Sequence, residues 1–595
     1  MKPHSHKISK VAIFALAIVA VVGLTVFISG QGNTPQVMGL PDDWTHHHVV
    51  FSDPGTAAEA LAAGHFNEWY RVVTDPRFRI HQMKRARAAT ASLSLAPTPG
   101  NVELLPDISD LASLSSARGG PPPKKIKLSK DWQEPLGSYA STAADQYPAK
   151  YSFTGSASCS DYVVYPTGVA GGSSQATMIA FTNLYPGTGT GQCGSSAPTV
   201  YWAYNTGGGT SNLSPVLSFD GTQVAFVQTV SGTANLVLLK MASSGSSVVS
   251  PSLATSASNY HSGCTSPCYF QFSLGTTDTN SSPFYDYAHD TMYVGDDAGI
   301  LHKYTTVFSG TPTVSGTPWP VTVRSGSILT GPVVDPNSGT IFVADGSGYL
   351  HSLSSSGGSL ASSSQLSTVG IQDAPLVDAA SSTSYVYVEN PYGGTTGHPA
   401  YVNIFSASSI SSYGVTSVAL TTTGSTSLKI YDGAFDNQHT SSTNGNYYVC
   451  ATDVTSGSAN ATLYQIAISS GPALTLHVYN QVSTTNTSPT CSPVTEFYDG
   501  THDWVFLSVN GNGQSITGCT TGACLYNYAV PANTTTHSGS PTAGLGVTGG
   551  SSGIIIDNNS TSPTGASNIY FYSLSSESCN STTSGCAVQA SQASP

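Results

Sequence analysis

Short apolar segments that alternate with polar turns recur along most of the chain, and two successive copies align easily. Each copy has a strand that ends in an acid, a second strand followed by Asp, and a third strand. They comprise 282–286, 291–296 and 299–304 in the first copy and 331–335, 340–345 and 348–353 in the second. A period of about 40–60 residues, each with several short strands, is typical of a β-propeller blade. The pattern therefore predicts an all-β propeller.

Eight copies of an inner-strand motif, often small-Pro-apolar-apolar-acid, occur after residue 150. They are Ser158–Asp161, Ser214–Asp220, Pro283–Asp286, Pro332–Asp335, Pro375–Asp378, Gly433–Asp436, Pro493–Glu496 and Gly553–Asp557. The last copy lacks room for a fourth strand, so we expect 147–153 to join it and close the ring, which removes an exposed sheet edge. Seven or eight blades fit; we favour seven, with one of the first two copies imperfect.

The N-terminus has a basic flank and an apolar run, the pattern of an export signal. Lys2, Lys7 and Lys10 precede twenty uncharged residues at 11–30. This run is long enough to span a hydrocarbon layer of ~30 Å, and the residues after it make a poor cleavage site. We interpret residues 1–32 as a signal anchor, in preference to a signal peptide that is removed, with the rest of the chain across the membrane.

Between this signal and the propeller, the sequence predicts two further segments. A small helical segment at 33–90 contains a capping box that begins at Thr56, and a later helix that begins at Asp75 and carries five basic residues. We interpret the basic residues as a solvated helix face, in preference to contact with anionic lipid or an acidic wall polymer. A Pro, Gly and Lys linker at 91–131 then leads to the propeller at 132–595.

The uneven charge of the chain excludes one class of partner. Only four of the 19 Lys and Arg lie beyond residue 150, together with 20 of the 32 Asp and Glu, so this region carries a net charge of −16. Proteins that bind nucleic acids need Lys and Arg to displace the counterions of the phosphates. We therefore exclude nucleic acid as a partner.

Ten Cys residues all fall within the repeats, which indicates disulfides in an oxidising compartment. No Cys-x-x-Cys occurs, which excludes c-type haem and argues against a zinc ribbon. Close spacing suggests three local pairs and two longer ones, although spacing alone does not fix the connectivity. The suggested pairs are Cys264–Cys268, Cys519–Cys524, Cys579–Cys586, Cys159–Cys193 and Cys450–Cys491.

Six acids end the inner strands and would gather near one mouth of the central channel. They are Asp286, Asp335, Asp378, Asp436, Glu496 and Asp557. A ring of carboxylates could hold Ca²⁺, because clustered acids ionise readily only beside a cation. The alternative is that each acid accepts hydrogen bonds from the turn that follows it, and we favour this role because it explains the recurrence without a ligand.

Three other motifs suggest a chemical role, but the residues around them do not support it. The run His46–His48 does not suit one ion, because adjacent residues diverge and no Cys or carboxylate pattern completes the set. The segment 189–194 fits Gly-x-Gly-x-x-Gly, and 549–553 fits the nucleophile elbow, yet neither has the strand-to-helix setting that the chemistry needs. Catalytic residues are therefore not assigned. Spacing along the sequence would not reveal a site whose residues come from several blades.

The two clearest copies resemble the repeats of secreted bacterial β-propellers of the PQQ-like, NHL and YVTN kind. The resemblance lies in Thr291-Met-Tyr-Val-Gly-Asp296 and Thr340-Ile-Phe-Val-Ala-Asp345, which match the strand core of those repeats. It implies the propeller fold over roughly 440 residues and no particular activity. Related quinoprotein dehydrogenases carry a Trp-containing motif in nearly every blade; here Trp is nearly absent from the repeats, so neither PQQ nor dehydrogenase chemistry follows.

These observations favour an exported, membrane-tethered β-propeller that acts as a binding or scaffold module in the cell envelope or outside the cell. Its expected partner is a protein or glycan at the cell surface, and its cofactor is unknown, with Ca²⁺ as the candidate. One alternative is a propeller enzyme, a lyase, hydrolase or redox protein, with a site at the central channel. Another is a structural subunit of a surface array or fibre.

Overall fold

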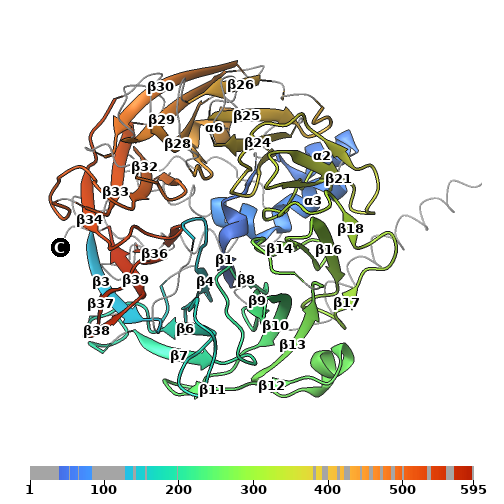
Figure 1. Cartoon of the computed structure of the whole chain (residues 1–595), viewed down its shortest axis with the longest axis vertical. Helices are drawn as coiled ribbons and strands as arrows, with labels where there is room; N and C mark the ends of the chain where they lie inside the picture. Colours follow the sequence, from blue (N-terminus) through green and yellow to red (C-terminus); the bar gives the residue numbers. More distant parts are fainter. Residues whose placement is uncertain are drawn as a thin grey trace, which may run out of the picture. The chain divides into compact units, whose positions relative to one another are not determined.

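The computed structural model describes residues 39–82 and 128–592 apart from short gaps. The gaps are 52–53, 65, 138–142, 155–156, 190, 197, 276, 380–383, 392–399, 412–413, 415, 421–428, 443–444, 454–459, 470–472, 484–488, 499–501, 521, 532–537 and 558–567. In the described residues, eight sheets surround a central channel as the blades of a β-propeller (Figure 1). The expected propeller is confirmed, and the preference for seven blades was wrong.

The first four blades follow one another in chain order, and their strands are given from the channel outward (Figure 1). Blade 1 contains β1 (Leu40–Asp42), β4 (Ala149–Ser152), β5 (Tyr162–Pro166), β6 (Met178–Thr182), β7 (Thr199–Tyr204) and β11 (Val248–Val249). Blade 2 contains β8 (Val216–Leu217), β9 (Gln223–Val230), β10 (Thr233–Lys240), β13 (Cys268–Ser273) and β12 (Ser252–Leu253). Blade 3 contains β14 (Phe284–Asp286), β15 (Thr291–Gly295) and β16 (Ile300–Thr305), which pairs with both β17 (Thr313–Val314) and β18 (Val321–Thr322). Blade 4 contains β19 (Val333–Val334), β20 (Ile341–Ala344), β21 (Leu350–Leu353) and β22 (Ala361–Ser362).

The other four blades complete the ring in the same way. Blade 5 contains β2 (Val49–Phe51), β23 (Leu376–Ala379), β24 (Tyr385–Asn390), β25 (Tyr401–Ser406) and β26 (Thr416–Ala419). Blade 6 contains β27 (Ala434–Phe435), β28 (Gly445–Asp453), β29 (Asn460–Ser469) and β30 (Ala473–Gln481), with α6 (Asn437–Ser442) between the first two. Blade 7 contains β31 (Thr495–Tyr498), β32 (His502–Val509), β33 (Cys524–Pro531) and β34 (Ala543–Gly546). Blade 8 contains β35 (Ile555–Asp557), β36 (Asn568–Tyr572), β39 (Cys586–Ser591) and β3 (Ser129–Pro135), beside a hairpin of β37 (Glu577–Cys579) and β38 (Thr582–Ser584).

The middle strands of the blades are buried on both faces, because each blade packs between two others. All four residues of β20 and all five of β36 are buried, so the side chains on both faces contribute to the core. Hydrophobic burial on two faces explains why these strands read as continuous apolar runs and not as strict alternation. The ring of packed sheets forms the core of the molecule.

Ring closure joins the two ends of the propeller through a strand that the sequence interpretation missed. β3 pairs with β39 as the outermost strand of blade 8, and its Trp132 is buried and donates a hydrogen bond from Nε1 to the Leu184 carbonyl (3.2 Å). We expected 147–153 to close the ring; Ala149–Ser152 instead forms the inner strand of blade 1. An outermost strand is half-exposed and mostly polar, so β3 lacks the apolar pattern of a propeller strand.

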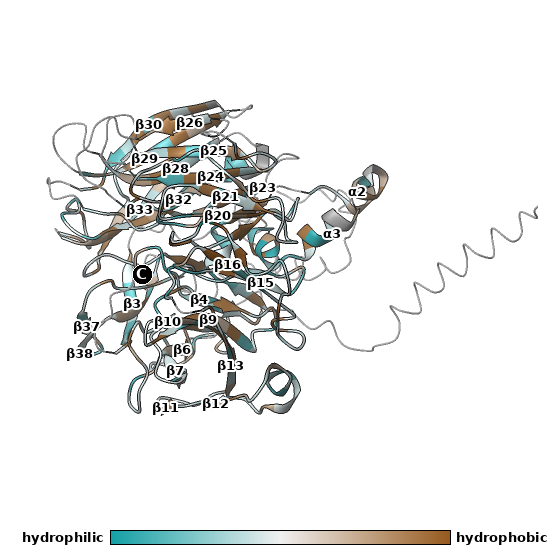
Figure 2. Cartoon of the chain, turned by 45° about the vertical axis from the view of Figure 1, so that its right-hand side comes forward, coloured by the Kyte–Doolittle hydropathy of each residue, from teal (hydrophilic) through white to brown (hydrophobic). Residues whose placement is uncertain are grey.

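The N-terminal segment, residues 39–82, begins at the centre of the ring, where Figure 1 shows its first elements in blue. Its strands β1 and β2 extend blades 1 and 5 toward the channel, and the 3₁₀ helix η1 (Trp44–His46) connects them. The helices α2 (Ala57–Ala63), α3 (Phe66–Thr74) and 76–82 follow, and Figure 2 shows α2 and α3 to one side of the blades. The capping box at Thr56 begins α2 as expected. No helix in the described ranges is long and apolar enough to cross a membrane.

Three sequence expectations concern residues that are not described. The signal at 1–32, the linker at 91–131 as far as residue 127, and the basic residues after 82 lie outside the described ranges. The end of that linker, from Ser129, belongs to β3. We expected the basic residues of this helix to lie on a solvated face. In the described part of the helix, Arg77 is buried instead. Its side chain forms an ion pair with Asp75 (2.6 Å) and lies over the ring of Phe284 (5.0 Å). The guanidinium therefore anchors the helix against blade 3.

All ten Cys are described, and they form the five disulfides that the spacing suggested: Cys159–Cys193, Cys264–Cys268, Cys450–Cys491, Cys519–Cys524 and Cys579–Cys586. Four of the pairs close loops within one blade or its connections, and the fifth links blade 6 to the segment before blade 7. Disulfides of this number are typical of proteins that fold in oxidising compartments. The cysteine prediction is confirmed.

Candidate functional site

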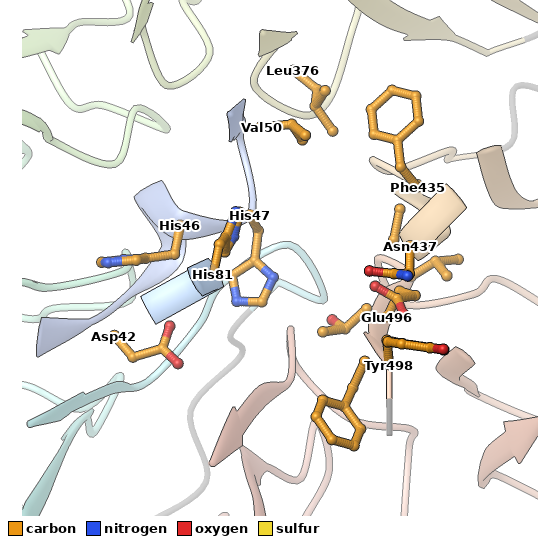
Figure 3. A pocket seen from close by; sticks show the side chains of 15 residues that line it. Asp42, His46, His47, Val50, His81, Leu376, Phe435, Asn437, Glu496 and Tyr498 are labelled. Carbon is orange, nitrogen blue, oxygen red and sulfur yellow. The ribbon is translucent and has the colours of Figure 1, made fainter. Parts of the chain in front are cut away.

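A pocket lies at the centre of the ring, where the N-terminal segment meets blades 5, 6 and 7. It encloses about 130 Å³. The lining residues are Asp42, His46, His47, Val50, His81, Leu376, Gly433, Ala434, Phe435, Asn437, Val494, Thr495, Glu496, Phe497 and Tyr498. Figure 3 shows the three His and Asp42 on one side and Asn437, Glu496 and Tyr498 on the opposite side. The site is therefore concave and combines imidazoles, carboxylates and aromatic rings.

The 3₁₀ helix η1 fixes the histidine side of the pocket through a capping box. Asp43 Oδ1 accepts a hydrogen bond from the Thr45 backbone N–H (3.0 Å), and His46 Nδ1 accepts one from the Asp43 N–H (3.2 Å). Trp44 donates from Nε1 to the Pro283 carbonyl of blade 3 (3.1 Å). These bonds hold a very short helix in one place, which isolated local propensity could not do.

Charge and stacking also restrain this side of the pocket. Burial alone would raise the pKa of Asp43, yet hydrogen bonds and the charge of His46 lower it below its usual value. The His47 ring stacks on Tyr147, with centroids 4.7 Å apart and planes inclined by 18°. Burial of Tyr147 raises its pKa well above the usual value, so this phenol stays protonated. The N-terminal segment thus offers a fixed array of rings to the pocket.

A buried ionisable cluster adjoins the pocket. His48 precedes β2, Asp373 precedes β23 and Asp432 precedes β27, and all three are buried. His48 Nδ1 lies 2.6 Å from Asp432 Oδ2, without hydrogen-bond geometry, and His48 Nε2 lies 3.9 Å from Asp373 Oδ1. Their chain neighbours His47 and Gly433 line the pocket. The cluster therefore lies directly beside it.

The carboxyl groups of this cluster resist ionisation. Burial raises the pKa of Asp373 to about 7, against the opposing charge of His48. Burial also raises the pKa of Asp432 and of Glu389 well above the usual values, and the charges of Asp432 and Asp373 add to these shifts. Tyr447 donates from its hydroxyl to Glu389 Oε1 (2.6 Å). Perturbed carboxyls in a concave region are a property of functional sites, although structural networks share it.

The six acids of the expected ring lie in different settings. Asp286 accepts from the Ala288 N–H (3.1 Å) and Asp335 from the Asn337 N–H (3.1 Å), while Asp436 accepts from the His439 N–H (3.0 Å). These are hydrogen bonds to the following turn, which is the role we favoured.

The other three acids have different contacts. Asp378 lies 2.8 Å from His439 Nε2 and Asp557 lies 2.9 Å from Lys150 Nζ, whereas Glu496 lines the pocket. Among the described residues, one group of His, Cys, Asp or Glu brings three ligand atoms within 4.8 Å of one another. That group is His48, Asp373 and Asp432, and it contains none of the six acids. A Ca²⁺ ring remains a prediction.

Two histidines in blades 3 and 4 form matching structural pairs with aspartates. His302 lies 3.0 Å from Asp296 and His351 lies 3.0 Å from Asp345, six residues earlier in each case. Each Asp also accepts hydrogen bonds from backbone N–H groups of the turn between the strands; for Asp345 these come from Ser347 (2.9 Å) and Tyr349 (3.0 Å). The pairs therefore hold the same turn in blades 3 and 4.

Sequence reasoning missed Asp373 and Asp432 and gave little weight to His48. A local signal was present: both acids lie just before an inner-strand motif, where other copies carry Ser282 or Thr330. Acids are rare in the repeats, so this placement distinguishes them. The His48 imidazole could be matched to them only once the N-terminal segment was placed within the ring.

No protein-family model matches the chain, and no curated protein does. Similar solved structures include BamB from Moraxella catarrhalis, with 14% identity, coverage of 78% of this chain and 97% of that chain, and a TM-score of 0.37. A chain of the mitotic checkpoint complex has 9% identity, coverage of 64% and 91%, and a TM-score of 0.35. The Cps50 (Swd1) β-propeller domain of Myceliophteria thermophila has 10% identity, coverage of 60% and 93%, and a TM-score of 0.32. These likenesses concern the propeller fold alone.

Proposed function

We propose that the protein is an exported β-propeller that acts as a binding module, with its ligand in the pocket at the centre of the ring. The pocket carries this proposal, because it brings together imidazoles, carboxylates and aromatic rings from the N-terminal segment and three blades. The basic and apolar pattern of residues 1–32 supports export, and so do the five disulfides. The run at 11–30 would tether the propeller to the membrane. We also assign the repeats to the PQQ-like, NHL or YVTN kind, on the resemblance at 291–296 and 340–345.

A sugar unit of a cell-surface glycan suits the pocket better than a protein side chain. Asp42 and Glu496 offer carboxylates that accept hydrogen bonds from hydroxyl groups, and the Asn437 amide both donates and accepts. Phe497 and Tyr498 offer ring faces to the apolar side of a sugar. A hydroxyl-rich ligand uses all of these groups, whereas one protein side chain would use few of them.

Binding to a glycan array tests the proposal directly. We would purify the full chain with its disulfides formed, and measure the affinity of the best ligand by calorimetry. Glu496→Gln and His81→Gln should each weaken binding about tenfold, the effect of about 1.4 kcal/mol expected for a lost polar contact. Asp278→Asn, at an exposed turn, is the control and should bind like the original. Equal binding by all the variants, or binding to proteins only, would contradict a glycan site here.

A propeller enzyme with a site at the channel is the second candidate. The observation that favours it is the pair Glu389 and Asp432: burial raises the pKa of both carboxyl groups well above the usual values, which favours the protonated form that a proton donor needs. Incubation of bound glycans with the protein, followed by mass spectrometry of the products, separates the two functions. Cleavage that Asp432→Asn abolishes would support the enzyme, and unchanged glycans would support a binding module.

A further inference from the structure

We propose that His48, Asp373 and Asp432 form a binding site for one divalent transition-metal ion. Each residue offers one ligand atom, and the three atoms lie within 4.8 Å of one another. All three side chains are buried, and they come from the N-terminal segment, blade 5 and blade 6. A metal here would join these three parts of the ring at its centre. This inference does not depend on the ligand proposed for the neighbouring pocket.

Unpaired oxygens in the cluster indicate a missing cation. Asp432 is 2% exposed, and its Oδ1 has no hydrogen-bond partner. Glu389, also 2% exposed and electrostatically coupled to Asp432, has no hydrogen-bond partner at Oε2. Leaving a buried oxygen without a donor is unfavourable, and more so where the group is charged. A metal ion bound by His48, Asp373 and Asp432 would satisfy the Asp432 oxygen, which one imidazole cannot do.

The charge balance leads to the same conclusion. One histidine stands among the three carboxyl groups of Asp373, Asp432 and Glu389, and the partly buried carboxyl of Asp145 also acts on this group. Buried charges persist only when they are paired or bind a metal. A dication would neutralise two of the carboxylates and bind the neutral imidazole. Protons shared between the carboxyl groups are the competing explanation, and they would leave no metal affinity.

The donor set selects the class of metal. An imidazole nitrogen with carboxylate oxygens suits Zn²⁺ or Mn²⁺, whereas Ca²⁺ and Mg²⁺ prefer oxygen ligands alone. Backbone groups already orient one ligand: Asp373 Oδ1 accepts from the Ala374 N–H (2.8 Å) and Oδ2 from the Asp432 N–H (3.0 Å). The Val377 N–H holds the His48 carbonyl (2.8 Å). Such outer contacts are typical of built metal sites, because they fix the ligand orientation.

Metal titration of the full, disulfide-bonded chain tests the site. Metal-free protein would be titrated with Zn²⁺ and, separately, with Mn²⁺, using calorimetry for the stoichiometry and Mn²⁺ electron paramagnetic resonance for the bound ion. The variants are Asp432→Asn, which keeps the side-chain shape, and His48→Gln. Asp335→Asn is the matched control, because Asp335 is equally buried but is bonded to its own turn. Circular dichroism and thermal unfolding confirm that each variant is folded.

We expect one equivalent of Zn²⁺ or Mn²⁺ per chain, and an affinity at least tenfold weaker in Asp432→Asn and His48→Gln. The control should bind like the original, and added metal should raise its unfolding temperature by the same amount. No stoichiometric binding of either ion, or equal binding by the folded Asp432→Asn variant, would overturn the proposal. Loss of binding in Asp335→Asn alone would also overturn it, in favour of the Ca²⁺-type ring of inner-strand acids.

Discussion

Lys150 is the cation at the junction of the first and last blades, and replacing it with Met should destabilise ring closure. Its side chain is 1% exposed, on the inner strand of blade 1. Nζ lies 2.9 Å from Asp557 and 3.8 Å from Asp161, and it donates to Ser152 Oγ (2.6 Å). Both Asp residues also accept from the Tyr185 hydroxyl (3.0 Å each). One lysine therefore lies between two buried carboxyl groups and balances the charge of one of them.

The expected loss in the free energy of unfolding is about 3–5 kcal/mol, because Lys150→Met leaves buried carboxylates without their cation. The matched control is Lys130→Met, on the closure strand β3 of blade 8. Lys130 lies 2.9 Å from Glu577 with a side chain 22% exposed, and such a pair contributes only about 0–1 kcal/mol. Urea and thermal unfolding of the oxidised protein, followed by circular dichroism, measure both losses.

The loss should depend on pH. Burial raises the pKa of Asp161 above its unfolded value even with the lysine present, and removing the lysine raises it further. The destabilisation is then small at pH 4.5 and grows as the pH rises to 8. Adding Asp557→Asn to Lys150→Met should recover at least half of the loss. If Lys150→Met unfolds like Lys130→Met, or if its loss is the same at both pH values, the reasoning is refuted.

Three further predictions concern the closure strand and the disulfides. Burial raises the pKa of Asp131 to about 7. The free-energy cost of burying the ionised carboxylate is therefore absent below the pKa of the unfolded state, near 4, and complete above pH 7. Asp131→Asn should add about 2 kcal/mol of stability at pH 8, allowing for partial exposure, and none at pH 4; a uniform effect would argue against burial as the cause. Trp132→Ala should remove about 3–5 kcal/mol by urea unfolding, because the indole is buried between the two ends of the ring; a loss below 1 kcal/mol would place closure elsewhere. Replacing Cys159 and Cys193 together by Ser should lower the free energy of unfolding by about 4 kcal/mol, since they lie 34 positions apart. This loss should be about twice that from removing Cys264–Cys268, which lie four positions apart; equal losses would contradict the loop-entropy argument.

The sequence determined the strands of the propeller, because the inner-strand motif and the strand after it are local patterns. Seven of the eight motifs mark the strand of their own repeat that lies nearest the channel; the exception, Ser158–Asp161, leads into β5, the second strand of its repeat after β4. The disulfide pairs were also readable, since Cys residues close in sequence, such as Cys519 and Cys524, have few other partners within reach. Local hydrogen bonds explain the turns at Asp286 and Asp335 in the same way.

The tertiary structure decided what depends on contacts between distant segments. β3 closes the ring by pairing with β39, although Ser129–Pro135 lacks the alternation of apolar residues that predicts a strand. The segment 39–51 fills the channel because its strands find free sheet edges in blades 1 and 5, and backbone hydrogen bonding at an edge leaves little trace in sequence. The meeting of His48 with Asp373 and Asp432 follows from that placement. The placement of 39–51 within the ring brings these distant residues together, so the centre of the ring could not be derived from spacing along the chain.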